Sequence, residues 1–247
     1  MSVKLEFYEN IGNWEFSMIS YHEEILENEF DYFKWIECYT NSESVCLDIG
    51  TGGGEKVLNN YPKVKKIIGI DYSKEMIKTA NINLEKSKRK NEDISFLKMD
   101  INNMEFEDNV FDVVTARHTN LNVEEIRRVL KPNGILIIEG VAKDDSLELK
   151  DKVGRGQCYF DEFGVEELEY EELKNGGFEF LENKMMILNE WYHSKEDFMG
   201  LLFKTPIIEN ITKKDLVKIE KYIEENTKFG NIKLIRRIYG FVCKNIK

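Results

Sequence analysis

The fold is decided by one segment, Val45-Cys46-Leu47-Asp48-Ile49-Gly50-Thr51-Gly52-Gly53-Gly54-Glu55. Its apolar half predicts a buried strand, which passes directly into a glycine-rich turn and then into the start of a helix. Glycine has no Cβ, so glycines at positions 50, 52 and 54 let the backbone turn tightly and approach a ligand closely. Because ligands of open α/β sheets bind at the carboxyl ends of the strands, this turn is a predicted ligand site.

The sequence around this segment alternates between short apolar runs and helical patterns. From Ser44 to Val141 this alternation is typical of βαβ units and of a parallel sheet. Ser73 and Asn122 are predicted helix caps, and the Pro132-Asn133-Gly134 run turns the chain into the fifth strand. The predicted strands are Val45 to Ile49, Lys66 to Ile70, Ile94 to Lys98, Val110 to Thr115 and Gly134 to Val141.

The two flanks of this region have less regular patterns. Before it, apolar residues at helical spacing predict a helix from Tyr21 to Glu37, which follows an aromatic arm. After it, Ala142 to Phe163 is a predicted charged loop. The other predicted elements are a helix from Val165 to Lys174, a strand from Phe178 to Tyr192, helices around Phe198 to Phe203 and through Leu216, Ile219 and Ile223, and a strand from Leu234 to Cys243.

Composition narrows the possible functions. The 247-residue chain has a formal net charge of -11, which argues against unspecific binding to a phosphate backbone, so no nucleic-acid partner is expected. Its four cysteines form no metal or disulfide pattern, so we expect reduced thiols and no metal. No segment resembles a signal peptide or a membrane span, so we expect a cytoplasmic protein without a membrane partner. The sequence leaves the oligomeric state open.

Two acidic residues narrow the ligand class. Asp48 lies two residues before the first glycine, and Asp71 ends the next strand, where a carboxylate can accept hydrogen bonds from both hydroxyls of a ribose. The nicotinamide dinucleotide fingerprint requires a third glycine at position 55, where this chain has Glu55. The negative charge of Glu55 repels a pyrophosphate, whereas a ligand with a cationic sulfonium and no phosphate tolerates it.

Four motifs, in family-like order from residue 40 to 142, resemble the class I S-adenosylmethionine-dependent methyltransferases. They are the Asp48-x-Gly50-x-Gly52-x-Gly54 pattern of motif I with the ribose-binding acid Asp71, the adenine-binding Met99-Asp100-Ile101, the fourth strand Phe111-Asp112-Val113-Val114, and the turn from Val129 to Leu136 into the fifth strand. The resemblance implies a doubly wound, mostly parallel, seven-stranded Rossmann-like sheet with an antiparallel last strand. It also implies S-adenosylmethionine as cofactor and S-adenosylhomocysteine as product.

The same resemblance assigns cofactor contacts to residues at the strand ends. The assigned contacts are Gly50, Thr51 and Gly52 with the methionine part, Asp71 with the ribose, Asp100 with the exocyclic amine, and Tyr72 and Ile101 with the adenine faces; Asp48, Gly54 and Arg117 complete the predicted site. Each residue also has a purely structural interpretation. The glycines suit any tight turn, the carboxylates suit solvated strand ends, and Tyr72 and Ile101 suit plain core packing.

The predicted acceptor side begins at Ala116-Arg117-His118-Thr119-Asn120, directly after the fourth strand. Methyl transfer from a sulfonium is an in-line displacement, which positioning and the exclusion of water can promote. A general base is needed only if the acceptor loses a proton. His118 is the candidate base and Arg117 a candidate partner for an acidic acceptor. Alternatively, both residues shape the cofactor pocket or bind a loop.

Other candidate substrate or lid residues lie far from this segment. Trp14 and Tyr21 belong to the aromatic arm, which either closes over the cofactor or simply packs. Arg155 lies in the loop after the fifth strand, and Tyr192 and His193 end the long strand beside a late helical insertion. For His193, an exposed loop position is the alternative.

We therefore expect one methyltransferase domain over residues 1–247. It consists of an amino-terminal arm and helix (1–43), a cofactor-binding core (44–142) and an acceptor-side half (143–247) with a helical insertion at about 195–230. The expected reaction transfers a methyl group from S-adenosylmethionine to an acceptor, for which a small molecule is predicted. Two alternatives stay open: a protein that binds S-adenosylmethionine without catalysis, and a nicotinamide-dependent oxidoreductase.

Overall fold

The computed structural model describes residues 19–247, so the predicted lid residue Trp14 lies outside the described residues. These residues form two compact units. The core unit comprises residues 30–140, 169–184 and 240–247, and the second unit comprises the described part of 1–29 together with 141–168 and 185–239. The predicted three-part division of a single domain remains a prediction.

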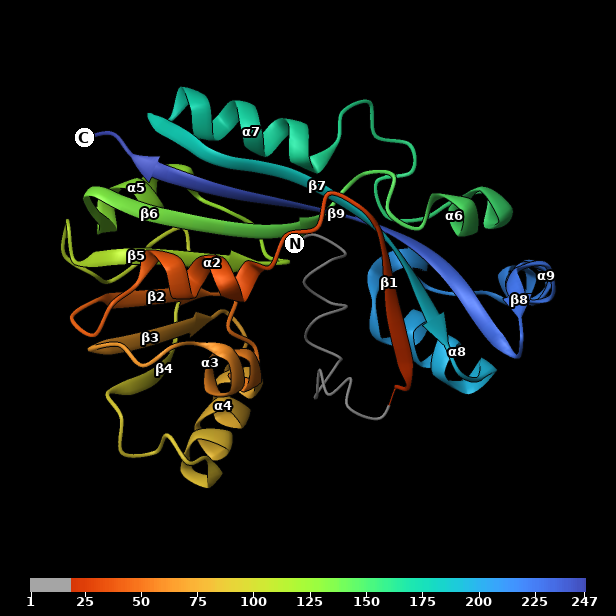
Figure 1. Ribbon diagram of the computed structural model, residues 1–247, viewed down its shortest axis with the longest axis horizontal. Helices are drawn as coiled ribbons and strands as arrows, with labels where there is room; N and C mark the ends of the chain where they lie inside the picture. The colour runs from red at the N-terminus through yellow and green to blue at the C-terminus, as the bar shows by residue number, and fades with distance from the viewer. Residues whose placement is uncertain (1–18) are drawn as a thin grey trace. The chain divides into compact units, whose positions relative to one another are not determined.

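The strands of the described chain form one sheet of nine, in the order β1-β7-β9-β6-β5-β2-β3-β4, with β8 paired to β9 (Figure 1). Their bounds are β1 Tyr21–Glu27, β2 Val45–Ile49, β3 Lys66–Asp71, β4 Ile94–Lys98, β5 Phe111–Arg117, β6 Leu130–Val141, β7 Phe178–Tyr192, β8 Thr227–Lys228 and β9 Asn231–Asn245. The strands from β4 through β6 pair in parallel. The mostly parallel, doubly wound fold is thus confirmed, with β1 and β8 added to the seven expected strands.

The direction of β9 follows from one contact in each unit. In the second unit, the Ala142 N–H, just after β6, donates to the Arg237 carbonyl in the middle of β9 at 2.9 Å. In the core unit, the Asn245 side chain at the end of β9 donates to the Leu130 carbonyl at the start of β6, at 3.4 Å. The end of β6 thus lies beside the middle of β9, and the start of β6 lies beside the end of β9. The two strands therefore run antiparallel.

The core unit carries four helices with one buried side against the sheet. They are α2 Tyr32–Tyr39, α3 Glu55–Asn60, α4 Lys74–Lys86 and α5 Val123–Val129. Ile36, Val57 and Ala80, one from each of the first three helices, are fully buried in a cluster with strand residues such as Ile67 and Val113. The caps predicted at Ser73 and Asn122 are confirmed, since their side chains accept the N–H of Met76 at 3.3 Å and of Glu125 at 3.0 Å.

The second unit has its own apolar cluster, built mainly by helices. Its helices are α6 Leu147–Val153, α8 Lys195–Lys204, the 3-10 helix Pro206–Ile208 and α9 Lys213–Asn226, while α7 Val165–Asn175 extends across both units. Leu149, Phe198, Ile219 and Tyr222 are buried together in this cluster. The two helices predicted late in the chain are therefore present as α8 and α9. No helix within residues 19–247 is both long and apolar enough to cross a bilayer.

The predicted helix from Tyr21 to Glu37 is wrong in its first part and confirmed from Tyr32 onward. Residues 21–27 form β1, which pairs antiparallel with β7, and α2 begins only at Tyr32. The first two apolar residues of the expected helix face, Ile25 and Leu26, are 43% and 48% exposed, whereas Phe30 and Ile36 are buried. Asn28 takes a positive φ of 52°, and Asp31 then caps a new helix. Pairing with a strand more than 150 residues away overrode the local helical pattern.

The predicted charged loop from Ala142 to Phe163 is wrong in its first part. Residues Leu147–Val153 form α6, which ends at Gly154 with a left-handed φ of 83°. Leu149 and Val153 are buried at 0% and 2% exposure. The segment is mostly charged and has few apolar side chains. Its apolar residues therefore do not repeat often enough to predict a helix from the sequence.

Candidate functional site

The glycine-rich turn after β2 has the backbone geometry that its sequence predicts. Gly50, Gly52 and Gly54 have φ values of 70°, 56° and 76°, a region that side chains with a Cβ rarely adopt. A Cβ on Gly50 would lie 2.7 Å from Thr119 Cβ, and one on Gly54 would lie 2.7 Å from Phe96 Cζ. At Gly52 no atom lies within 4 Å of that position. The turn is therefore packed at its two ends and open at its middle.

Asp71, at the end of β3, lies against this open position. Its Oδ2 accepts the Gly52 N–H at 3.0 Å, and its Oδ1 accepts the Ser73 N–H at 2.8 Å. Burial raises the pKa of this carboxyl, against the opposite effect of the two backbone N–H groups. Each carboxylate oxygen keeps a further lone pair for a ligand hydroxyl. The carboxyl end of β3 thus places the free lone pairs of Asp71 next to Gly52. The space beside Gly52 is open, because glycine has no Cβ to fill it.

Asp48 is part of a buried network that faces away from solvent. It is 7% exposed, and its Oδ1 accepts hydrogen bonds from the Tyr61 hydroxyl at 2.6 Å and from Thr115 Oγ1 at 2.9 Å. Burial raises the pKa of the Asp48 carboxyl, while these hydroxyls lower it. These hydrogen bonds join β2 to α3 and β5. Asp48 therefore stabilises the strand end from which the glycine-rich turn begins.

The residues predicted to bind adenine lie at the ends of β3 and β4. Tyr72 follows Asp71, is 48% exposed, and has the Lys98 ammonium 5.9 Å from its ring centroid. Asp100 is exposed, and its Oδ1 accepts the backbone and side-chain N–H groups of Asn102, both at 2.9 Å. Ile101 is half-buried in the same turn. Both turns follow carboxyl ends of neighbouring parallel strands, on the same sheet edge as Gly52.

Arg117 and His118, at the end of β5, gather around one carboxylate that the sequence analysis missed. Glu139 of β6 is 9% exposed and is the register partner of Arg117. Its Oε1 lies 2.6 Å from Arg117 Nε and 3.4 Å from His118 Nε2. The one signal for Glu139 was a single charge inside the apolar run Ile135 to Gly140. The Arg117 guanidinium is therefore already paired by the protein.

His118 has an unusual backbone conformation for a side chain of its size. Its φ is 53°, in the left-handed region, and its N–H donates to the Glu139 carbonyl at 2.8 Å. Left-handed residues other than glycine are uncommon and concentrate at functional sites. The side chain is 36% exposed, so a ligand at the carboxyl ends of the strands can reach it.

Three of the predicted acceptor-side residues gather in the second unit. Tyr21 stacks on Tyr192 with ring centroids 5.4 Å apart. Tyr192 is 1% exposed, and its hydroxyl donates to Glu190, so it is a core residue of this unit. His193 is exposed, and its ring contacts Ser20 and His22.

Arg155 lies elsewhere in that unit and has a supporting position. Its guanidinium donates to the Glu209 and Asn210 carbonyls at 2.6 and 3.1 Å and to Asp215 Oδ2 at 2.8 Å. Asp215 closes the capping box of α9. Arg155 thus joins its loop to the start of α9, and a contact with substrate stays a prediction.

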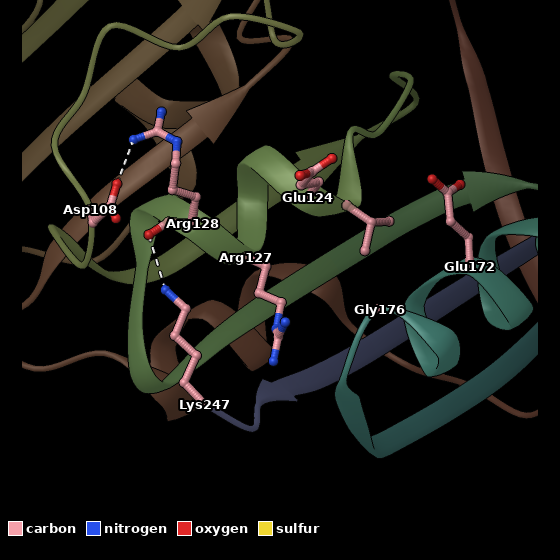
Figure 2. A pocket seen from close by; sticks show the side chains of 8 residues that line it. Asp108, Glu124, Arg127, Arg128, Glu172, Gly176 and Lys247 are labelled. Atoms are coloured by element: carbon pink, nitrogen blue, oxygen red, sulfur yellow. Dashed lines mark hydrogen bonds and ion pairs between the residues drawn. The ribbon is translucent and has the colours of Figure 1, made fainter.

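A hollow of about 430 Å³ lies at the opposite edge of the core unit's sheet, where β5 and β6 begin. Figure 2 shows side chains that line it, with Arg128 directed to Asp108 and Lys247 bonded to the backbone. None of the predicted site residues lies there. Within residues 19–247, no group of three or more His, Cys, Asp or Glu side chains is placed to hold a metal ion.

Comparisons with known proteins identify the family of the chain. The sequence profile of a family described as "Methyltransferase domain" matches residues 40–184, more than half of the chain. The uncharacterized methyltransferase YcgJ of Bacillus subtilis is 32% identical over 120 residues, which are 45% of this chain and 46% of that protein. Demethylmenaquinone methyltransferase of Porphyromonas gingivalis is 31% identical over 114 residues, which are 42% of this chain and 46% of that protein. The chain thus matches about half the length of these relatives.

Solved structures extend the likeness to most of the chain. The crystal structure of YcgJ from Bacillus subtilis has a TM-score of 0.62 at 18% identity and covers 87% of this chain and 98% of that one. A SAM dependent methyltransferase from Aquifex aeolicus has a TM-score of 0.53 at 18% identity and covers 87% of this chain and 89% of that one. At such identities the likeness shows a shared fold.

Proposed function

Because the chain belongs to the methyltransferase family, we propose that it transfers a methyl group from S-adenosylmethionine to a small-molecule acceptor. The observation that carries this proposal is the contact between Asp71 and the open, left-handed Gly52 at 3.0 Å. A ribose hydroxyl can bind the remaining lone pairs of Asp71 while the rest of the ligand passes over a backbone without a Cβ.

Glu55 supports this donor over a nicotinamide dinucleotide. A Cβ on Gly53 would lie 2.5 Å from Glu55 Oε1, so the carboxylate lies directly against the turn. It accepts a hydrogen bond from Asn83 Nδ2 at 3.0 Å, which fixes it there. A pyrophosphate on this turn would meet that negative charge, whereas a sulfonium ligand carries no phosphate.

The protein's own groups would bind, orient and exclude water. S-adenosylmethionine supplies an electrophilic methyl group when it is bound. Gly50 to Gly54 and Asp71 would hold the cofactor, and Tyr72, Asp100 and Ile101 would surround its base. His118 would take the acceptor's proton at an imidazole nitrogen, next to the Arg117–Glu139 ion pair. Positioning of donor and acceptor supplies the remaining rate enhancement.

A small-molecule acceptor is favoured by charge and by the relatives. The net charge of -11 disfavours a nucleic-acid acceptor. One relative is a demethylmenaquinone methyltransferase, which acts on a small molecule.

Calorimetry with S-adenosylhomocysteine and with NAD tests the donor. We expect saturable binding of S-adenosylhomocysteine and no binding of NAD. Asp71→Asn should weaken the binding of S-adenosylhomocysteine by about 1–3 kcal/mol, because buried polar groups lose a hydrogen-bond partner. Asp93→Asn, an exposed aspartate at an ion-pair distance from Lys66, is the matched control and should bind as the wild type does. Saturable heat with NAD alone would refute the proposal.

Release of S-adenosylhomocysteine in a screen of small-molecule acceptors tests catalysis. A protein that only binds the cofactor would protect it without turnover. Turnover with at least one acceptor is the expected result, and at low cofactor concentration it should be reduced in Asp71→Asn and unchanged in Asp93→Asn.

A further inference from the structure

Two of the chain's three histidines lie side by side at the end of the β1–β7 ladder. His22 belongs to β1, and His193 directly follows β7. Nδ1 of His22 is 2.9 Å from Nε2 of His193, and the ring centroids are 5.2 Å apart. Both side chains are exposed. A separation of 171 residues along the chain hides this pair from any search for ligand spacing.

Ser20 fixes the orientation of the His193 ring. Its Oγ lies 2.7 Å from His193 Nδ1, and its carbonyl accepts the His193 N–H at 3.1 Å. The Ser20 N–H in turn donates to Asp197 Oδ1 at 2.8 Å. When His193 donates Nδ1–H to the serine oxygen, its Nε2 must present a lone pair toward His22. A hydrogen-bonded second nitrogen that fixes the tautomer is the usual setting of a metal-binding histidine.

We propose that His22 and His193 bind a divalent transition-metal ion of the class that prefers imidazole, such as Zn²⁺, Cu²⁺ or Ni²⁺. The ion takes the place of the proton that the two facing nitrogens now share. His22 then carries its own proton on Nε2, so both rings remain neutral and no proton is lost.

The distances allow this exchange with little movement. Zinc–nitrogen bonds of about 2.0–2.1 Å in tetrahedral geometry place two nitrogens about 3.3 Å apart. The present 2.9 Å therefore has to widen by about 0.4 Å, which the exposed His22 side chain can do by rotation while Ser20 holds His193. The remaining positions belong to water or to an external ligand, consistent with the lack of a third grouped ligand among the described residues.

The surrounding charge favours a cation at this place. Glu24 lies two residues after His22 on β1, hence on the same face of the ladder. Its Oε2 is held by Asn189 Nδ2 at 2.9 Å and by Trp191 Nε1 at 3.0 Å. This anchored carboxylate and Asp197, which accepts the Ser20 N–H, outnumber the Lys228 ammonium that acts on Glu24, so the charge around the histidine pair favours a cation. The site uses only groups of the second unit and does not depend on the proposed methyl transfer.

Titration of the chelator-treated full chain with Zn²⁺ alone tests the site. We expect one saturable equivalent for the wild type and binding weaker by about tenfold or more in His22→Gln and in His193→Gln. Ser20→Ala, which removes the orienting oxygen, should also weaken binding. His118→Gln removes the third histidine, in the core unit, and should bind Zn²⁺ as the wild type does.

Cu²⁺ gives an independent spectroscopic signature. The electron paramagnetic resonance spectrum should show coupling to two imidazole nitrogens in the wild type and to one in each single variant. Urea unfolding of the metal-free variants checks that they fold, and S-adenosylhomocysteine binding reports separately on the core unit. Zn²⁺ binding that is absent in the wild type, or equal in His22→Gln, His193→Gln and wild type, would overturn the proposal.

Discussion

The Tyr61 hydroxyl donates a 2.6 Å hydrogen bond to the buried Asp48 carboxylate, directly below the glycine-rich turn. The same hydroxyl lies 2.8 Å from Thr115 Oγ1, which also binds Asp48. One carboxylate oxygen thereby joins the end of α3, the end of β2 and β5. Asp48 lies two residues before Gly50, so this contact holds the strand end directly before the turn.

Removal of the Tyr61 hydroxyl should loosen the turn. Tyr61→Phe leaves the buried Asp48 with one donor fewer, so we expect a loss of about 1–3 kcal/mol in the free energy of unfolding, measured in urea. We also expect weaker binding of S-adenosylhomocysteine by calorimetry. Tyr222→Phe is the matched control, because Tyr222 is also a buried tyrosine and its hydroxyl donates to the Lys233 carbonyl in the second unit. An affinity in Tyr61→Phe equal to that of the control would contradict the coupling.

Alanine substitutions at Gly52 and Gly230 separate the cost of backbone strain from the effect of a Cβ on ligand binding. Both have a left-handed φ, 56° and 82°, and a Cβ on either one would meet no atom within 4 Å. Gly52→Ala and Gly230→Ala should therefore each cost about 1–2 kcal/mol of stability from the backbone conformation alone. Only Gly52→Ala should also weaken binding of S-adenosylhomocysteine, since its Cβ would occupy the proposed ligand space. Equal affinities of the two variants would place the cofactor elsewhere.

His118→Asn tests the proposed base while keeping the backbone. Asparagine is among the residues that tolerate a left-handed φ best, so the variant should fold. If His118 takes the acceptor's proton, turnover should fall by about a hundredfold or more, with S-adenosylhomocysteine affinity nearly unchanged. The reverse outcome, weaker cofactor binding at full turnover, would make His118 a residue of the cofactor pocket.

The change of folding stability at acidic pH should depend on the contact between Arg155 and Asp215. The Arg155 guanidinium holds the pKa of the Asp215 carboxyl well below its usual range. Such a group adds stability that is present above the pKa of the unfolded chain and lost as the pH falls through the lower folded value. Arg155→Gln should therefore be less stable than the wild type at neutral pH, and the difference should shrink below about pH 4.

Urea unfolding between neutral and acidic pH measures this difference. Lys152→Gln is the control, because it breaks an ion pair with Glu225, which is 58% exposed, and should change stability by at most about 1 kcal/mol. A gap between Arg155→Gln and wild type that stays constant at acidic pH would show that the carboxylate is not the group responsible.

The part of the structure that local sequence decides was largely predictable. The turn from Gly50 to Gly54 needs left-handed residues wherever it lies, and Ser73 and Asn122 cap helices through contacts within three residues. The parallel strands β2 to β6 also follow from local apolar runs, because burial on both faces requires them. Asp71 was found for the same reason, since a strand and its end are local features.

Other features were decided only when distant segments met. Residues 21–27 have a helical pattern but form a strand, because β7 supplies their hydrogen-bond partners. Glu139 stands out only after parallel register places it beside Arg117, and His22 meets His193 only across the β1–β7 ladder. Turns and caps depend on neighbours in the chain, so the sequence alone determines them. A charge pair or a pair of imidazoles depends on strand register, which the tertiary structure sets by pairing separate strands, 171 residues apart in the case of the two imidazoles.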